Sequence, residues 1–271
     1  NLCFGYCGLL SLVQAGVYAI GGYIFAILTT RIGFSWWETI IISVAVTTLV
    51  GFILAVISMR SRGSAFIIIS ILFAQFVKLV ALNWTDVTNG QAGILSIPGM
   101  ECFGILITSK LAIYFYMLIF VVIIQFLTER ITDSKIGRGF IAVKQDESLA
   151  ISLGISPYRY SIAAFTIGVA FTALAGCFHA SFAQMVSPEM ADFNNVMLYI
   201  IMMVVVGGRG TLWGPVIGAF IFTFLPEYLR FADMLRIPIF GMILIVLVLF
   251  IPDGIIPSCN KILRKYKILR E

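Results

Sequence analysis

Long apolar runs, separated by short polar stretches, dominate the pattern of hydrophobic and polar positions along the chain. A run of about 20 apolar residues is long enough to cross a bilayer as an α-helix. Each run is continuously apolar, unlike the alternating pattern of a transmembrane β-strand. We therefore expect an all-α integral membrane protein in which about eight transmembrane helices form a single domain over residues 1–271. The runs cover residues 9–30, 37–59, 64–82, 111–128, 161–184, 195–207, 212–226 and 239–256.

The sixth and seventh runs are shorter than a complete span and are separated by a glycine-rich stretch, Gly207 to Gly210. Short segments interrupted by glycine are tolerated at membrane depth where they face protein or a water-filled cavity. The pattern therefore indicates a region of the protein that lines an internal space.

Composition supports a membrane protein and excludes several other classes. The chain is 61% hydrophobic and only 11% charged, with a mean hydropathy of +1.05. Soluble domains are about 45–50% apolar and about 25% charged. So few charged residues could not cover a core made of the remainder. Secreted, cytosolic and nucleic-acid-binding proteins are therefore excluded, and the chain is expected to lie in the lipid bilayer.

The basic residues are unevenly distributed and indicate the orientation of the chain in the membrane. They cluster between the second and third runs, between the fourth and fifth runs, and in the last eleven residues. Alternating spans place all three clusters on one side, which the excess of Lys and Arg marks as cytoplasmic. We therefore expect a cytoplasmic loop at 129–160 and a basic cytoplasmic tail at 258–271.

The loop at 129–160 is the longest polar segment and predicts two short helices, over 138–145 and 147–153. Asp146 is a suitable N-cap for the second helix, and Gly154 suits its left-handed end. Helical spacing places an apolar stripe on one face, which is suited to docking into a groove on another protein. The alternative is an amphipathic loop that lies on the lipid surface. The stripe consists of Ala142, Leu149, Ala150 and Leu153.

The sequence lacks the common catalytic and nucleotide-binding motifs. It contains no G-x-x-x-x-G-K-[ST], no H-E-x-x-H and no G-x-S-x-G. Its single histidine, His179, has no neighbouring metal ligands in the sequence. No Asp or Glu lies near the middle of an apolar run, where a proton-driven carrier usually has one. We therefore expect no enzyme activity, no catalytic residues, no cofactor and no metal site.

Three segments together resemble a known family. They are Asn1 to Tyr23, with Gly5, Gly8 and Gly21-Gly22; Gly137 to Tyr160, with Asp146-Glu147 and Gly154; and Gly207-Gly208-Arg209-Gly210-Thr211-Leu212-Trp213-Gly214-Pro215. In this order and spacing they are similar to LivM-like permease subunits of bacterial branched-chain amino acid ABC importers. The resemblance runs through essentially the whole chain.

The resemblance implies a multi-subunit importer in the bacterial inner membrane. In such a machine two permeases, two cytoplasmic ATPases and an extracytoplasmic substrate-binding protein work together. This chain would be one permease, and the second permease would be homologous to it. ATP would be hydrolysed in the partner subunits, and branched-chain amino acids (Leu, Ile and Val) would move into the cytoplasm.

The resemblance also assigns a role to the cytoplasmic loop. The stretch Glu147-x-x-Ala150-x-x-x-Gly154 resembles the "EAA" element through which permeases of ABC importers contact their ATPases, with Leu149 where a second alanine is common. A small residue would let the ATPase approach closely, and an acidic residue could meet basic residues at the edge of the ATPase surface. The expected ATPase-docking residues are Arg138, Asp146, Glu147, Leu149, Ala150 and Gly154.

Two glycine-containing segments are candidates for a gate or hinge. Glycines permit bends and close helix contacts, and a charge between two short apolar runs is expected to face water or a carboxylate. The alternatives are ordinary helix packing for the glycines and a simple topology charge for the arginine. The candidates are Gly5, Gly8, Gly207, Gly208, Arg209 and Gly210.

The polar stretch 83–100 lies on the predicted outer side. It predicts an ordered loop at the external mouth that contacts the binding protein or lines the entrance; the alternative is a solvated connector. The candidate residues are Asn83, Trp84, Asp86 and Asn89.

Two other functions remain open. The same kind of permease could carry urea, short amides or another amino acid. A stand-alone secondary transporter would need no ATPase partner, and it could use sodium coordinated by backbone carbonyls.

Overall fold

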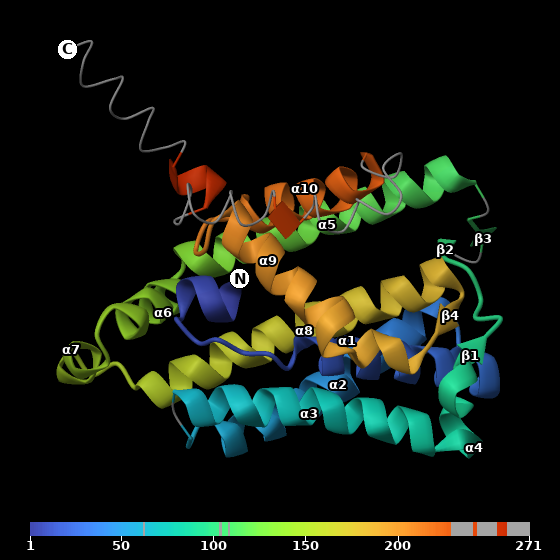
Figure 1. Cartoon of the computed structure of the whole chain (residues 1–271), viewed down its shortest axis with the longest axis horizontal. Helices are drawn as coiled ribbons and strands as arrows, with labels where there is room; N and C mark the ends of the chain where they lie inside the picture. The colour runs from blue at the N-terminus through green and yellow to red at the C-terminus, as the bar shows by residue number, and fades with distance from the viewer. Residues whose placement is uncertain (62, 103–104, 108, 229–240, 243–253, 259–271) are drawn as a thin grey trace, which may run out of the picture.

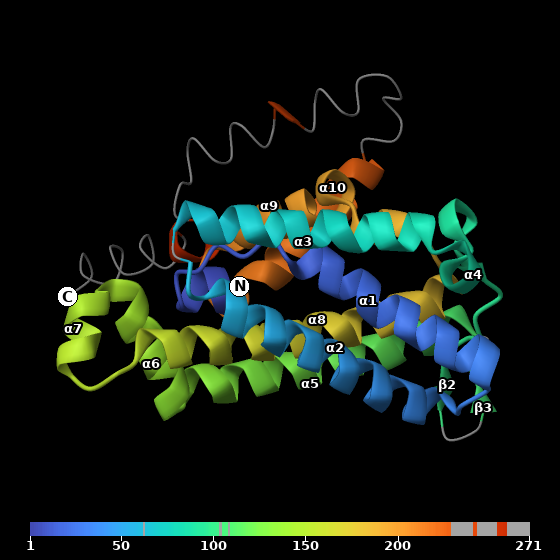
Figure 2. The same cartoon turned by 90° about the horizontal axis from the view of Figure 1, so that it is seen from below.

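The computed structural model describes the chain except for residues 62, 103–104, 108, 229–240, 243–253 and 259–271 (Figure 1). Long helices run roughly alongside one another along the length of the molecule (Figures 1 and 2). The long helices are α1 (Gln14–Ile27), α2 (Trp36–Ser58), α3 (Ser64–Asn83), α5 (Lys110–Asp133) and α8 (Pro157–Ala183).

Shorter elements complete the described part of the fold. Two antiparallel pairs of very short strands, which the sequence did not predict, join Ile94 to Val186 and Glu101 to Leu106. The short helices are α4 (Thr85–Thr88), α6 (Lys135–Gln145), α7 (Glu147–Ser152), α9 (Leu198–Gly207) and α10 (Gly214–Tyr228). The strands are β1 (Ile94–Leu95), β2 (Glu101–Cys102), β3 (Ile105–Leu106) and β4 (Met185–Val186).

The helices confirm the prediction of a multi-pass, all-α membrane protein. Among the described residues, five helical segments are long and apolar enough to cross a membrane, and Phe193–Gly207 is a shorter apolar helix. Seven of the eight predicted runs coincide with helices. Most of the eighth run, 239–256, and most of the basic tail lie outside the described residues. The spanning segments are Gln14–Ile32, Trp36–Ser58, Ser64–Asn83, Lys110–Asp133 and Pro157–Ala183.

The core of the bundle forms where α8 packs against α1 and α2. Small residues allow the backbones to approach closely, as is common between transmembrane helices. A Cβ atom added at Gly21 would lie 2.6 Å from the carbonyl oxygen of Ala173 on α8. Trp36 at the start of α2 donates a hydrogen bond of 2.8 Å to the hydroxyl of Ser181 on α8. These contacts fix α8 at the centre of the molecule.

The first predicted span is interrupted, which corrects the expectation of a continuous run from residue 9. Residues Leu2–Tyr6 form one π-helical turn, residues 8–13 are not helical, and α1 begins only at Gln14. Gly8 has a φ of +78°, which ends the first turn. The Leu12 N–H then donates to the Ser70 hydroxyl on α3 at 3.1 Å, so a side chain replaces a helical partner.

The polar regions lie at opposite ends of the bundle. Helices α6 and α7 extend beyond one end, whereas α4 and the short strands lie at the other (Figures 1 and 2). This arrangement places the predicted cytoplasmic loop and the predicted outer loop on different sides of the spans.

Candidate functional site: a capped helix pair, a glycine junction and two clefts

The loop predicted to be cytoplasmic forms the expected pair of capped helices. The side chain of Ser134 accepts hydrogen bonds from the N–H groups of Ile136 and Gly137, so α6 begins three residues before its predicted start. The carboxylate of Asp146 accepts from the Ser148 and Leu149 N–H groups at 2.7 and 3.0 Å, which confirms its role as an N-cap.

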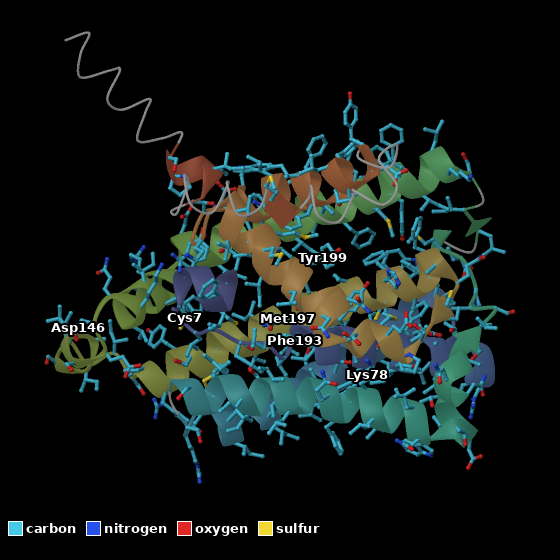
Figure 3. The ribbon with its side chains drawn as sticks, viewed as in Figure 1. Cys7, Lys78, Asp146, Phe193, Met197 and Tyr199 are labelled. Carbon is cyan, nitrogen blue, oxygen red and sulfur yellow. The ribbon has the colours of Figure 1, made fainter. Side chains whose placement is uncertain are left out.

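Two further residues fix the orientation of this helix pair. Gly154 has a φ of +78°, so α7 ends in the left-handed conformation that its position predicts. Arg138 is exposed, and its guanidinium donates to the carbonyl oxygen of Asp133 at 3.1 Å. Asp146 lies at one end of the molecule, far from Tyr199 near its middle (Figure 3).

The structure divides the predicted apolar stripe of this loop into two faces. Ala150 is 1% exposed and packs in a cluster with Cys7 and Phe140, whereas Leu149 and Leu153 are 59% and 69% exposed. One side of the six-residue helix α7 packs against the bundle, so the residues on that side are not available on its exposed surface. Ala150 therefore anchors α7 rather than forming its free surface, and this corrects the idea of one continuous docking stripe. Glu147 is exposed beside this face.

The two glycine segments, 202 residues apart, meet at one place. The Asn1 side chain donates to the Thr211 carbonyl oxygen at 2.8 Å and accepts from the Gly210 N–H at 3.0 Å. A Cβ atom added at Gly5 would lie 2.9 Å from Gly210 Cα and closer still to Gly210 N. Lys144 on α6 donates to the Gly5 carbonyl oxygen at 2.6 Å. We call this contact between Leu2–Tyr6 and residues 207–211 the glycine junction.

The remaining candidates of this group lie in or beside the junction. Gly8 has a φ of +78° and approaches the side chain of Lys144. Gly208 and Gly210 have φ values of +121° and +73°, so the turn that they form favours glycine. Gly207 closely approaches Gly214 at the start of α10. The guanidinium of Arg209 lies 5.4 Å from the centre of the Phe4 ring, a cation–π contact that the topology argument did not predict.

Two clefts lie beside α8 and α9. The inner cleft has a volume of about 270 Å³ and reaches the glycine junction, and the outer cleft has a volume of about 790 Å³. Phe171, Thr172 and Ile200 line both, so the two clefts adjoin along these helices. The inner cleft has polar groups from Asn1, Ser11, Gln14, Gln125, Thr128 and Thr172. The outer cleft has polar groups from Tyr18, His179, Ser187, Glu189, Asn195 and Tyr199.

The candidates for the external mouth lie together at the end opposite α7. Asn83, Trp84 and Asp86 are exposed, and Trp84 is 56% exposed despite its size. Asn89 is exposed and has a φ of +59°, which asparagine tolerates. Arg31, after α1, donates at 2.8 Å to the Asp86 carbonyl oxygen and holds α4 in place. An ordered loop is therefore present in this region.

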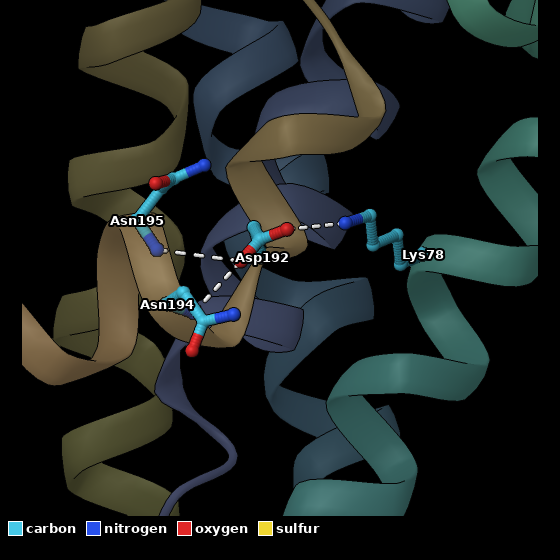
Figure 4. Close-up of polar contacts among 4 residues, drawn as sticks. All are labelled: Lys78, Asp192, Asn194 and Asn195. Atoms are coloured by element: carbon cyan, nitrogen blue, oxygen red, sulfur yellow. Dashed lines mark hydrogen bonds and ion pairs between the residues drawn. The ribbon is translucent and has the colours of Figure 1, made fainter.

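An ion pair that the sequence did not reveal connects α3 to the start of the α9 segment. Lys78 pairs with Asp192, whose carboxylate also accepts from the N–H groups of Asn194 and Asn195 (Figure 4). The ammonium of Lys78 holds the pKa of Asp192 below its ordinary value. Lys78 lies in an apolar run, so the sequence alone predicted only that its side chain extends and places the ammonium group at the membrane surface.

Replacing Asp192 by asparagine is expected to destabilise the protein by about 1 kcal/mol, because it removes a partly buried charge pair while asparagine still caps the helix. The expected measurement is a lower melting temperature in detergent than for Glu189→Gln, which changes an exposed carboxylate nearby. At neutral pH the pair contributes fully. Its contribution falls as the pH drops below 3.8, the ordinary value, through the lowered pKa of Asp192. Equal melting temperatures for both variants would contradict this role.

Among the described residues, no group of three or more His, Cys, Asp or Glu residues is placed to hold a metal ion. The site combines a helix pair outside the bundle, a close contact of two glycine-containing segments and two partly polar clefts.

Comparison with known proteins decides which family this arrangement represents. The family described as "Branched-chain amino acid transport system / permease component" matches residues 1–252. The chain belongs to this permease family. The match confirms the resemblance found in the sequence and, together with the spanning helices, places the chain in a family of multi-pass permeases of the bacterial inner membrane.

Several curated proteins are similar to the permease. The high-affinity branched-chain amino acid transport system permease proteins LivM of Salmonella typhimurium and of Escherichia coli K12 are each 30% identical over 95% of this chain. The chain spans 66% of the length of each of these LivM proteins. LivH of Salmonella typhimurium, from the same kind of system, is 24% identical over 82% of this chain and 76% of its own length. No solved structure matches the permease.

Proposed function

We propose that the permease moves branched-chain amino acids into the cytoplasm as one of two permease subunits of an ABC importer. The observation that carries this proposal is the inner cleft, which combines apolar walls with a few uncharged polar groups. Such a lining suits a small zwitterion with an aliphatic side chain. The relatives named LivM and LivH are permeases of branched-chain amino acid transport systems, which favours this cargo over urea or short amides.

The partners follow from the surfaces at the two ends. Two cytoplasmic ATPases would dock on the exposed side of α7 in this chain and in its partner, with Leu149, Ile151 and Leu153 as the apolar contact. An extracytoplasmic binding protein would deliver the cargo at the end that holds Trp84 and Asp86. The similarity of this one chain to both LivM and LivH supports a second, homologous permease as its partner.

The hydrogen bonds between α6 and the glycine junction supply a route by which motion of the ATPases could reach the inner cleft. Helix α7 is anchored through Ala150, and α6 carries Lys144, which bonds to Gly5 at 2.6 Å. Gly5 touches Gly210, and residues on both sides of this contact line the inner cleft. A shift of the helix pair would therefore displace the glycine junction, which acts as the cytoplasmic gate in this proposal.

The test is a competition experiment on the complete importer in proteoliposomes. With the binding protein outside and ATP at the ATPases, radiolabelled leucine should accumulate inside. Unlabelled isoleucine and valine should reduce this uptake, and urea or acetamide in large excess should not. Uptake of urea without uptake of leucine would contradict the proposed cargo and would leave the ABC machinery in place.

A further inference from the structure

The inner cleft contains buried polar atoms that have no hydrogen-bond partner among the residues that the structure describes. Ser11 is 5% exposed, and its hydroxyl oxygen makes no hydrogen bond; the side-chain oxygen of Gln14 is also buried without one. Both residues line the inner cleft. Buried polar groups are nearly always paired, so unpaired groups beside a cleft point to a ligand that pairs with them.

The interruption of the first span places a helix N-terminus beside the same atoms. Helix α1 begins at Gln14, and its N-cap residue, Val13, has no side chain that could accept from the first turn. An uncapped N-terminus carries a positive partial charge and N–H groups that favour an anion. In membrane transporters, interrupted helices of this kind direct their N-termini at the carboxylates of substrates.

The segment before α1 is held in place by the protein and not by the ligand. The Ser70 hydroxyl on α3 accepts from the Leu12 N–H at 3.1 Å. Leu12 and Val13 are 5% and 0% exposed, so they are packed on both sides of the bond. Ser11 and the first turn of α1 therefore keep a fixed geometry without cargo, as a binding site requires.

We propose that the inner cleft is the cargo subsite of the permease and that it holds the α-carboxylate of an amino acid at the N-terminus of α1. The Ser11 hydroxyl donates to this carboxylate, and the Gln14 side-chain oxygen accepts from the α-ammonium group. The aliphatic side chain lies against Met197, Ile201 and Val204 of the same cleft. This inference rests on the proposed function and names the place at which the cargo is recognised.

The chemistry of the cleft fits a transient site. None of the described residues that line it has a charged side chain. The cargo would therefore meet a helix N-terminus, a hydroxyl and an amide, which bind a zwitterion less tightly than an arginine and a carboxylate would. Weak binding suits a passage, because a cargo held tightly in the ground state is released slowly. The volume of about 270 Å³ is close to the lower limit of small-molecule sites, about 300 Å³.

The experiment compares two serines that are both buried and both without a hydrogen-bond partner. Ser58, at the end of α2, is 1% exposed, and its hydroxyl also has no hydrogen-bond partner, but it does not line the inner cleft. Ser11→Ala and Ser58→Ala thus remove the same atom from comparable surroundings. Both are measured in the complete importer, as leucine transported per ATP hydrolysed at saturating binding protein. Recovery of the assembled complex controls for folding.

Ser11→Ala is expected to lower this ratio at least fivefold, whereas Ser58→Ala stays within twofold of the unmodified protein. Gln14→Met should also lower it, because methionine has no oxygen that accepts from the α-ammonium group. Equal ratios for the two alanine variants would overturn the subsite while leucine transport by the unmodified importer stands. An unchanged ratio for Gln14→Met would overturn the placement of the α-ammonium group at this oxygen. An unmodified importer that does not transport leucine would overturn the proposed function itself.

Discussion

Gly5→Ala is expected to reduce ATP-driven transport by the permease more than tenfold while the helix bundle stays assembled. The added methyl group would lie 2.9 Å from Gly210 Cα and would overlap with Gly210 N, so the two sides of the glycine junction must separate. Separation also breaks the bond of Lys144 to the Gly5 carbonyl oxygen. Overpacking of this kind costs about 1–3 kcal/mol, which a bundle with several buried clusters can absorb.

The control is a glycine whose added methyl group meets no backbone. At Gly99, near the opposite end, the nearest atom to an added Cβ is the tip of the Gln184 side chain at 3.2 Å, which can move aside. Gly99→Ala is therefore expected to transport at close to the normal rate. Both variants should be recovered from membranes in similar amounts. Normal leucine uptake by Gly5→Ala would show that the glycine junction is passive packing and not a gate.

The second large effect concerns the exposed side of α7. The double substitution Leu149→Asp with Leu153→Asp is expected to reduce recovery of the ATPases with the permease at least tenfold. These side chains are 59% and 69% exposed, so neither contributes to holding α7 on the bundle. A carboxylate buried in an apolar contact without a partner is strongly unfavourable, and the ATPase contact is lost while the fold remains.

A matched control places the same change at the other end of the molecule. Leu95 in β1 is 57% exposed, and Leu95→Asp should leave ATPase recovery unchanged. Ala150→Trp serves a different purpose, because Ala150 is buried and its replacement should destabilise the attachment of α7. ATPases that co-purify equally with the double variant and with Leu95→Asp would contradict docking on α7.

Most of the fold could be predicted because it follows from one strong signal, the length and continuity of apolar runs. The interruption of the first span between Gly8 and Gln14 could not be predicted from that signal, because the residues there are nearly as apolar as those in the helix that follows. Gly8 ends the first turn, and the non-helical stretch is then held by a hydrogen bond from Leu12 to Ser70, a contact between residues 58 positions apart. Periodicity within a single segment carries no information about such a partner.

The candidate site was predicted in its parts but not in its assembly. Asp146 and Gly154 were identifiable because capping is local. The contact of Gly5 with Gly210 and the pair of Lys78 with Asp192 join distant residues, so they required the structure. The inward position of Ala150 was missed for a related reason, because a six-residue helix does not itself specify which side faces the bundle.

The energy source for leucine uptake tests the central claim most directly. Proteoliposomes that contain the permease, its partner permease and the ATPases would be supplied with binding protein and radiolabelled leucine. Uptake would then be measured with ATP alone, and with a sodium or proton gradient in place of ATP. The account predicts accumulation with ATP and binding protein together, and none with either gradient. Leucine uptake driven by an ion gradient without ATP would contradict it and would identify a stand-alone carrier.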